Sequence, residues 1–211
     1  MTAEKRNGAH VGQRSDAKQK MVQAARQLIR ERGYGATAFS DVLTLSGAPR
    51  GSVYFHFPGG KAQLAMEAAE AHAREQVEII DRAASDASSA AQLIERYVDL
   101  GRAGMVASDY ARGCGVAPLV TDGAAQESAE LRETSRRAFA EMTDRLEFHF
   151  VALGADRAVA RVLADAVIAG VQGAMITSRA LRSPAPYDSV RAVLVSYAAT
   201  VSGQAGLRTR R

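Results

Sequence analysis

Apolar residues recur at three- and four-residue spacing along most of the chain, which is the pattern of amphipathic helices. Near the start, Met21, Ala24 and Leu28 follow this spacing and predict a helix from Ser15 or Asp16 to about residue 32. Further helices are expected over about residues 40–46, 49–57, 61–84, 89–107, 125–153, 156–182 and 188–202. No segment shows the alternation of a strand. The pattern therefore predicts an all-α protein with an N-terminal three-helix unit and a larger helical body.

Residues 37–61, TAFSDVLTLSGAPRGSVYFHFPGGK, carry the most specific pattern. Ser40 is a natural cap for a first short helix, Gly47 suits a tight turn, and Pro49 suits the first position of a second short helix. Two helices joined by a short glycine-containing turn are typical of a helix-turn-helix. The second helix carries arginine, serine, tyrosine and histidine, which hydrogen-bond to phosphates and base edges. This segment predicts a DNA-binding protein.

The charge is unevenly distributed. Residues 1–61 contain ten Lys and Arg against four Asp and Glu, a balance of +6. The remaining residues contain 17 basic and 19 acidic residues, a balance of −2. Basicity concentrated in one small region is typical of a polyanion binder, although a basic tail without a partner gives the same count.

Other classes of function receive little support. The single cysteine, Cys114, excludes an internal disulfide framework and a multi-cysteine zinc site. His72 with Glu75, and Glu147 with His149, do not amount to a set of three or four metal ligands, so no metal or cofactor is expected. No signal peptide is visible, and the apolar run over residues 162–177 is too short to span a bilayer. These observations favour a cytoplasmic protein without a membrane partner.

The same signals divide the chain into four parts. Residues 1–14 are expected to be a disordered basic arm, and residues 15–60 a helix-turn-helix domain. Residues 61–205 are expected to form a helical regulatory and dimerisation domain, and residues 206–211 a flexible tail. The glycine-rich residues 108–124, which include a proline, are expected to be irregular with one helical turn.

The helix-turn-helix, with the flanking RERGYGATAFSDVL and SGAPRGSVYFHFPGGKAQLAMEAA, resembles the TetR family of transcriptional regulators. SGAPRGSVYFHFPGGK and the later RGCGVAPLVTD resemble its LmrA/YxaF-like branch, the lincomycin-resistance-repressor type. The motif resemblance covers about residues 17–80 and 112–122, and elsewhere only the architecture is similar. The resemblance implies no enzyme activity.

The resemblance also implies which residues contact DNA. These are Arg50, Gly51 and Ser52 at the start of a recognition helix in the major groove, and Ser40, Tyr54, His56 and Lys61 at backbone phosphates. Four of these residues have an alternative interpretation. Arg50 could be an ordinary solvated arginine and Tyr54 a core residue. His56 could have a capping or packing role, and Lys61 could be a free surface lysine. Phe55 departs from many relatives, and since Tyr54 and Phe55 are neighbours, one of them is expected to pack on the first helix.

The resemblance further implies a homodimeric repressor that binds a palindromic operator and is released by a small apolar or aromatic effector. The many small residues of helices 157–182 and 187–203 suit either intramolecular packing or a two-fold four-helix interface. Candidate effector-binding residues are Met105, Tyr110, Cys114, Phe139, Met142, Phe150 and Met175, all of which equally suit a core. A DNA-binding regulator without an effector and a small helical enzyme remain as alternatives.

Overall fold

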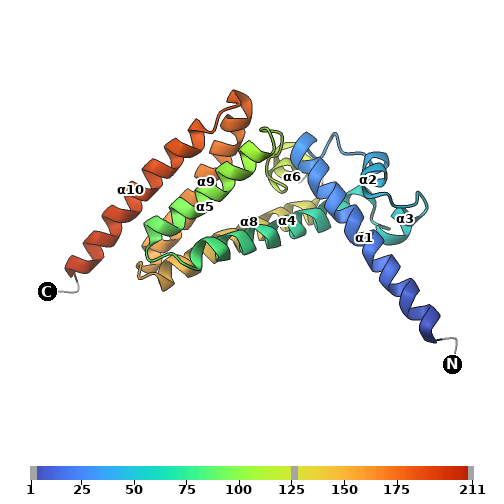
Figure 1. Cartoon of the computed structure of the whole chain (residues 1–211), viewed down its shortest axis with the longest axis horizontal. Helices are drawn as coiled ribbons and strands as arrows, with labels where there is room; N and C mark the ends of the chain where they lie inside the picture. Colours follow the sequence, from blue (N-terminus) through green and yellow to red (C-terminus); the bar gives the residue numbers. More distant parts are fainter. Residues whose placement is uncertain (1–3, 125–127, 209–211) are drawn as a thin grey trace. The chain divides into compact units, whose positions relative to one another are not determined.

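The chain forms helices and connecting turns throughout its described part, as the sequence predicts. The computed structural model describes residues 4–124 and 128–208, with side chains from residue 16 to residue 201 outside that gap. The helices are α1 (Glu4–Arg32), α2 (Phe39–Ser46), α3 (Ser52–His56), α4 (Gly60–Ala84), α5 (Ala90–Ala107), α6 (Ala117–Thr121), α8 (Ala129–Ala152), α9 (Arg157–Leu181) and α10 (Ala185–Arg208) (Figure 1). No strand occurs among these described residues.

The helices form two compact units. The N-terminal unit contains residues 1–72 and 115–136, and the C-terminal unit contains residues 73–114 and 137–211. This division differs from the boundary at residues 60 and 61 expected from sequence. The reason is that α4 and α8 each contribute to both units, and α6 packs with the N-terminal helices although it lies far along the chain.

The core of the N-terminal unit includes Met21 and Leu28, as the apolar spacing in α1 predicts, whereas Leu45, whose spacing in α2 also predicts an inward position, is 47% exposed. The members of this core are fully or almost fully buried side chains of α1 to α4 and α6 and of the segment between α3 and α4, including Met21, Leu28, Val42, Val53, Phe57, Leu64 and Leu119. The helical part of α1 begins at Glu4, earlier than the expected start at Ser15 or Asp16 and inside the arm expected to be disordered. Once the packed part of a helix exists, each added residue gains a hydrogen bond without a new nucleus, so the helix extends.

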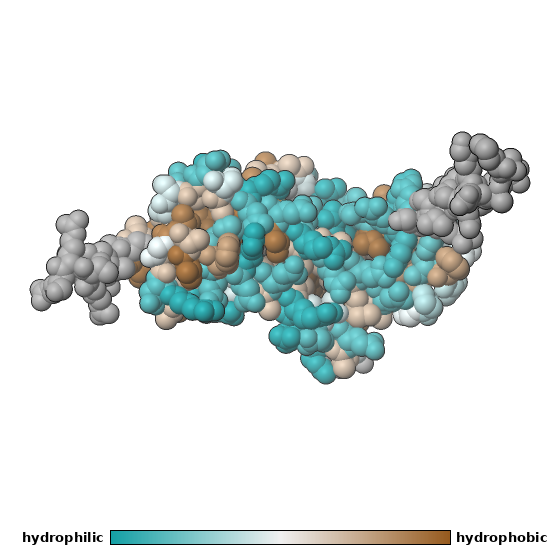
Figure 2. Space-filling model, turned by 90° about the horizontal axis from the view of Figure 1, so that it is seen from below, coloured by the Kyte–Doolittle hydropathy of each residue, from teal (hydrophilic) through white to brown (hydrophobic). Residues whose placement is uncertain are grey.

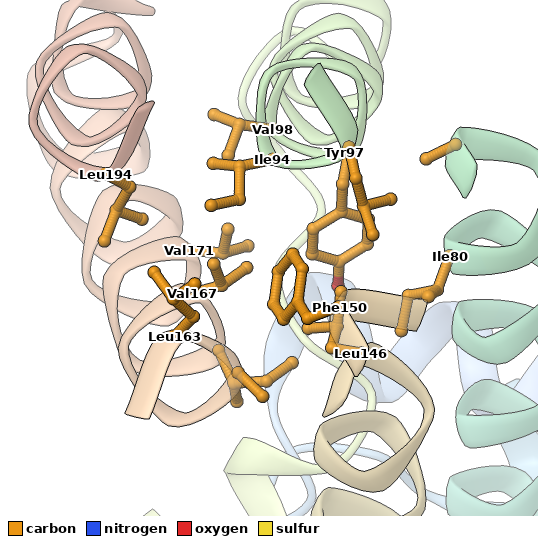
Figure 3. Close-up of a cluster of buried hydrophobic side chains, with 14 of the residues drawn as sticks. Ile80, Ile94, Tyr97, Val98, Leu146, Phe150, Leu163, Val167, Val171 and Leu194 are labelled. Carbon is orange, nitrogen blue, oxygen red and sulfur yellow. The ribbon is translucent and has the colours of Figure 1, made fainter. Parts of the chain in front are cut away.

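The core of the C-terminal unit gathers apolar side chains from α4, α5, α8, α9 and α10. Figure 3 shows Ile80, Tyr97, Phe150, Val167 and Leu194 from these five helices pointing toward one another. Beside this core, the Asp81 carboxylate accepts hydrogen bonds from Arg145 and contacts the His149 ring at 2.7 Å. The Arg145 guanidinium, more than the histidine, holds the pKa of that carboxyl below its usual range. The ion pairs therefore join α4 to α8.

The end of the chain departs from the prediction in two ways. Helix α10 begins at Ala185 and continues to Arg208, rather than running from Asp188 to about residue 202 with a tail from residue 206. Pro184 accepts backbone hydrogen bonds from Tyr187 and Asp188, so the proline initiates the first turn instead of interrupting the chain. Residues 209–211 of the expected tail lie outside the described residues.

The apolar part of α9 is longer than the run over residues 162–177 expected from the sequence. By length and composition Arg157–Leu181 is sufficient to cross a membrane, because apolar residues continue on both sides of the expected run over residues 162–177. A core helix passes the same test, and Leu163, Ala164, Val167 and Ala174 of α9 are buried in the C-terminal core.

Candidate nucleic-acid interface

Helix α2 ends in a sharp glycine turn. Gly47 has φ +66°, a conformation that costs glycine little and other residues more, and this is where the sequence predicts a turn. Ser40 is not the cap of α2, because the cap position is Ala38, which offers no side-chain bond, and Phe39 is the first helical residue. Thr37, the nearest hydroxyl before the helix, bonds to the Gly33 carbonyl instead. Ser40 is exposed in the first turn of α2, where backbone N–H groups lack helical partners.

Helix α3 begins later than the sequence indicates. Pro49 opens a turn rather than the helix, because its carbonyl accepts bonds from both the backbone N–H and the hydroxyl of Ser52, the first residue of α3. Gly51 occupies the cap position with helical φ and ψ. Arg50 therefore lies in the turn immediately before α3, with an exposed side chain. Arg50, Gly51 and Ser52 together form the N-terminal end of this short helix.

The two consecutive aromatic residues of α3 both face solvent. Tyr54 is 75% exposed and Phe55 is 67% exposed, so neither side chain belongs to the core. Val53 of α3 and Phe57, which directly follows α3, are the buried residues here. Tyr54 leans toward Phe39 of α2, with ring centroids 6.2 Å apart. The outer face of α3 is thus unusually aromatic.

His56 and Lys61 lie at the far end of the motif and are both partly buried. The His56 ring packs against its neighbours, with its centroid 5.1 Å from that of Phe55. The Lys61 ammonium donates a 3.0 Å hydrogen bond to the Gly35 carbonyl and lies 4.5 Å from the centre of the Tyr34 ring. Burial lowers the pKa of Lys61, and the neighbouring Asp122 carboxylate opposes part of that effect. Lys61 is therefore engaged within the N-terminal unit.

Ion pairs fix α1 against the other helices of the unit. Arg32 at the end of α1 contacts Asp41 of α2 at 2.9 Å, and Lys18 contacts Glu67 of α4 at 2.9 Å. The arrangement is a short helix with an exposed Arg-Gly-Ser start and an aromatic outer face, held on a three-helix scaffold by a glycine turn. This geometry defines the class of helix-turn-helix DNA-binding proteins.

The comparisons with known proteins agree with this class and narrow it. Residues 21–68 match the family model described as bacterial regulatory proteins, tetR family. Residues 90–193 match the model described as transcriptional regulator LmrA/YxaF-like, C-terminal domain. The chain is 36% identical over 177 residues to an uncharacterized HTH-type transcriptional regulator of Mycobacterium tuberculosis, covering 82% of this chain and 89% of the relative. The chain belongs to the TetR family of transcriptional regulators, within its LmrA/YxaF-like group, and this is a family of regulators rather than enzymes.

A further relative and two solved structures are also similar to this chain. The HTH-type transcriptional regulator LmrA of Bacillus subtilis is 29% identical over 175 residues, covering 81% of this chain and 90% of LmrA. Crystal structures of TetR regulators from Legionella pneumophila and Rhodobacter sphaeroides have TM-scores of 0.73 and 0.72 at 20% and 24% identity. Each covers 85% of this chain, and the matches span 95% and 97% of those two chains. These structures share the fold of this protein.

The seven residues expected to bind an effector all lie in the C-terminal unit, in or beside its core. Met105, Cys114, Met142 and Phe150 are buried, whereas Tyr110, Phe139 and Met175 are partly buried. Six of them belong to or pack against the apolar cluster, and Cys114 is the exception. The described residues contain no group of three potential metal ligands. The structure thus brings six of these residues to one region without distinguishing a pocket lining from a core.

Two described cavities have linings different from those expected. One, of about 640 Å³, is open and lies beside Phe148 and Val151 of α8 and Arg157 and Arg161 of α9. The other, of about 10 Å³, lies in the N-terminal unit. Neither is lined by any of the seven candidate residues.

Sequence reasoning missed Asp122, whose carboxylate binds the backbone of the loop between α1 and α2. The Tyr34 N–H donates to its Oδ2 at 2.8 Å and the Gly35 N–H at 3.2 Å. The only local signals are the glycines that flank Tyr34 and the RGCGVAPLVTD segment that ends in Asp122. Neither signal by itself pairs the two segments.

Proposed function

We propose that the protein is a ligand-responsive repressor that binds a palindromic operator as a homodimer. The observation that carries this proposal is the exposed start of α3, where Arg50 stands free of the core beside Gly51 and Ser52. Recognition helices read base edges with their N-terminal residues, and arginine is suited to bidentate contact with guanine. Gly51 lets the backbone approach the groove, and Ser40, Tyr54, His56 and Lys61 are the proposed phosphate contacts.

A homodimer is supported by the exposed apolar residues of the last two helices. Ile176 of α9 is 65% exposed and Val193 of α10 is 68% exposed, and Val162 and Tyr197 are also exposed. A Cβ at Gly170 would lie 2.9 Å from Val190, so α9 and α10 pack closely side by side. Figure 2 shows hydrophobic surface, in brown, gathered over the C-terminal unit on the left of the view. Joining two such faces would bury apolar area and place two recognition helices on one operator.

The effector part of the proposal rests on the chemistry of the C-terminal core. Methionine and aromatic side chains adapt to apolar ligands, and Met105, Tyr110, Cys114, Phe139, Met142, Phe150 and Met175 supply them. The small apolar or aromatic effector class is what the family resemblance implies, and the apolar character of these seven residues is consistent with it. An inducer must bind the DNA-incompetent state more tightly, since a ligand with equal affinity for both states shifts nothing.

The test is a mobility shift with duplex DNA from upstream of the gene for this protein, with and without a panel of planar aromatic antibiotics and flavonoids. A salt-sensitive shift released by one compound supports both halves of the proposal. Loss of release in Met142→Ala, with DNA binding retained, would assign the site to the C-terminal core. Absence of a shift at low salt would contradict operator binding.

A DNA-binding regulator without an effector is the second candidate. It is favoured by the burial of Met105, Met142 and Phe150 in a packed cluster and by the two described cavities, which do not include them. A shift that no compound releases, combined with unchanged melting temperature in the presence of every compound, would favour this candidate over the ligand-responsive one.

Replacing Lys61 with methionine should weaken binding to specific and non-specific DNA alike. A lost phosphate contact reduces the slope of log K against log salt by about 0.9, or about 1.8 for two half-sites. Filter binding at several salt concentrations measures this slope. Lys20→Met is the control, because Lys20 is an exposed α1 lysine paired with Asp16 at 2.7 Å. A weaker complex with an unchanged slope would mean that Lys61 acts only through its bond to Gly35.

A further inference from the structure

Asp122, the residue directly after α6, accepts two hydrogen bonds from the loop between α1 and α2 and so joins this helix to the loop. Asp122 lies 88 positions after Tyr34 and 87 positions after Gly35, and all three residues belong to the N-terminal unit. In Figure 1, α6 lies beside the C-terminal end of α1. The loop leads directly into α2, so its conformation sets where the first helix of the helix-turn-helix begins.

The loop is shaped for a carboxylate at this place. Gly33 has φ +88°, and a Cβ there would lie 2.7 Å from the Asp122 Oδ2 atom, closer than a side chain tolerates. The same oxygen accepts both the Tyr34 and the Gly35 N–H groups. Glycine at position 33 therefore allows an approach that satisfies two backbone donors with one carboxylate oxygen.

Lys61 holds the other side of the same loop. The Lys61 ammonium donates a hydrogen bond to the Gly35 carbonyl and lies over the Tyr34 ring. The N–H group of the same Gly35 donates to the Asp122 carboxylate. The loop is thus fixed through its N–H groups by α6 and through its carbonyl by the start of α4. Two of the helices that surround the helix-turn-helix meet at these three loop residues.

The segment that carries Asp122 is itself firmly seated. Val116 and Leu119 are fully buried, and a Cβ at Gly115 would lie 2.7 Å from the ring of the buried His72 in α4. The Thr121 hydroxyl donates to the other Asp122 oxygen, Oδ1, at 3.3 Å. The exposed Asp122 carboxylate therefore projects from the end of a helix that is anchored by buried residues.

We infer that Asp122 is a positioning residue for DNA binding, whose carboxylate sets the loop ahead of α2 and, with Lys61, the seating of the helix-turn-helix. This inference rests on the operator binding proposed above. The negative charge of Asp122 by itself opposes DNA binding, because a carboxylate in a unit that binds a polyanion repels phosphate. Removing Asp122 should therefore weaken binding only if its hydrogen bonds outweigh its adverse charge.

The experiment compares Asp122→Ala, Asp122→Asn and Asp122→Glu on a duplex selected by the full-length wild-type protein from random sequences. Asparagine offers one carbonyl oxygen, which suffices because a single oxygen accepts both loop bonds, and it removes the adverse charge. The Asn variant should bind at least as tightly as wild type, and the Ala variant on the order of tenfold or more weakly. The Glu variant keeps the charge but is one methylene too long, so it should also bind more weakly. Asp16→Ala is the control, since it removes an exposed acid of the same unit and should not weaken binding.

Amide hydrogen exchange separates positioning from general stability. The Tyr34 and Gly35 amides should exchange faster in the Ala variant than in the Asn variant, while the buried amides of α1 remain protected in both. If the Ala variant does not fold, the ranking of Asn above Glu decides the question. Ala binding as tightly as wild type, or Asn binding as weakly as Ala, would overturn the inference. Failure of the wild-type protein to select any duplex would instead overturn the proposed operator binding.

Discussion

Substitution of Arg50 by alanine is expected to weaken operator binding more than any other single change in the N-terminal unit. A bidentate contact to a base contributes about 1–3 kcal/mol, so a dimer that reads two half-sites should lose about 2–6 kcal/mol. This corresponds to roughly a 30-fold to more than 10⁴-fold weaker complex. The reason is geometric, because the Arg50 side chain is exposed at the start of α3, where a recognition helix meets base edges.

The measurement is a fluorescence anisotropy titration against the operator and against variants of it at each position. Arg50→Lys keeps the charge but loses the planar fork, so it should retain non-specific affinity while losing discrimination at one base pair. Arg132→Ala is the matched control, because Arg132 is an exposed arginine of α8 in the same unit. If Arg50→Ala and Arg132→Ala lose equal operator affinity, Arg50 contributes to binding only through its charge.

The parts of the interface predicted from sequence are those with local causes. A turn at Gly47 follows from the conformational freedom of glycine, and the buried face of α1 with Met21, Ala24 and Leu28 follows from helical spacing. The chain also indicated the all-helical class, because the apolar spacing is sustained over nearly every helix. The family resemblance then assigned roles to Arg50 and its neighbours, which remain predictions about DNA contact.

The parts that could not be predicted depend on contacts between distant segments. Ser40 has a good capping side chain, but α2 begins at Phe39 because backbone bonds from Asp41 and Val42 to the Ala38 carbonyl already form its first turn. One of Tyr54 and Phe55 was expected to pack on the first helix, yet both side chains are mostly exposed and Phe57 is the buried aromatic residue here. The local signals around Asp122 do not pair it with the α1–α2 loop, because its partners are fixed by the packing of α6 and not by the residues next to it.

The unusually apolar α9 illustrates the same limit. Its composition alone is consistent with a membrane span, a core helix or a dimer interface. Burial of Val167 and Val171 on one side and exposure of Val162 and Ile176 on the other separate two faces of this helix. The buried face is explained by the C-terminal core, and the exposed face is the part that the proposed dimer would cover.

Disruption of that exposed face is expected to abolish operator binding at a distance from the DNA. Ile176→Glu with Val193→Glu would place charges in the proposed interface, and burying each unpaired charge costs about 3–5 kcal/mol. The dimer should therefore dissociate on the order of a hundredfold or more readily. Because each free protomer binds only one half-site, and the half-sites of such operators lie roughly 34 Å apart, the affinity gained by joining them is lost.

Sedimentation equilibrium measures the dimer dissociation constant, and anisotropy titration of the same samples measures operator affinity. Val106→Glu is the matched control, because Val106 is an exposed apolar residue of α5 that receives the same new charge outside α9 and α10. The two measurements should change together in the double variant and remain unchanged in the control. A double variant that stays dimeric would place the interface elsewhere, and a monomer that keeps full operator affinity would show that the two half-sites are read independently.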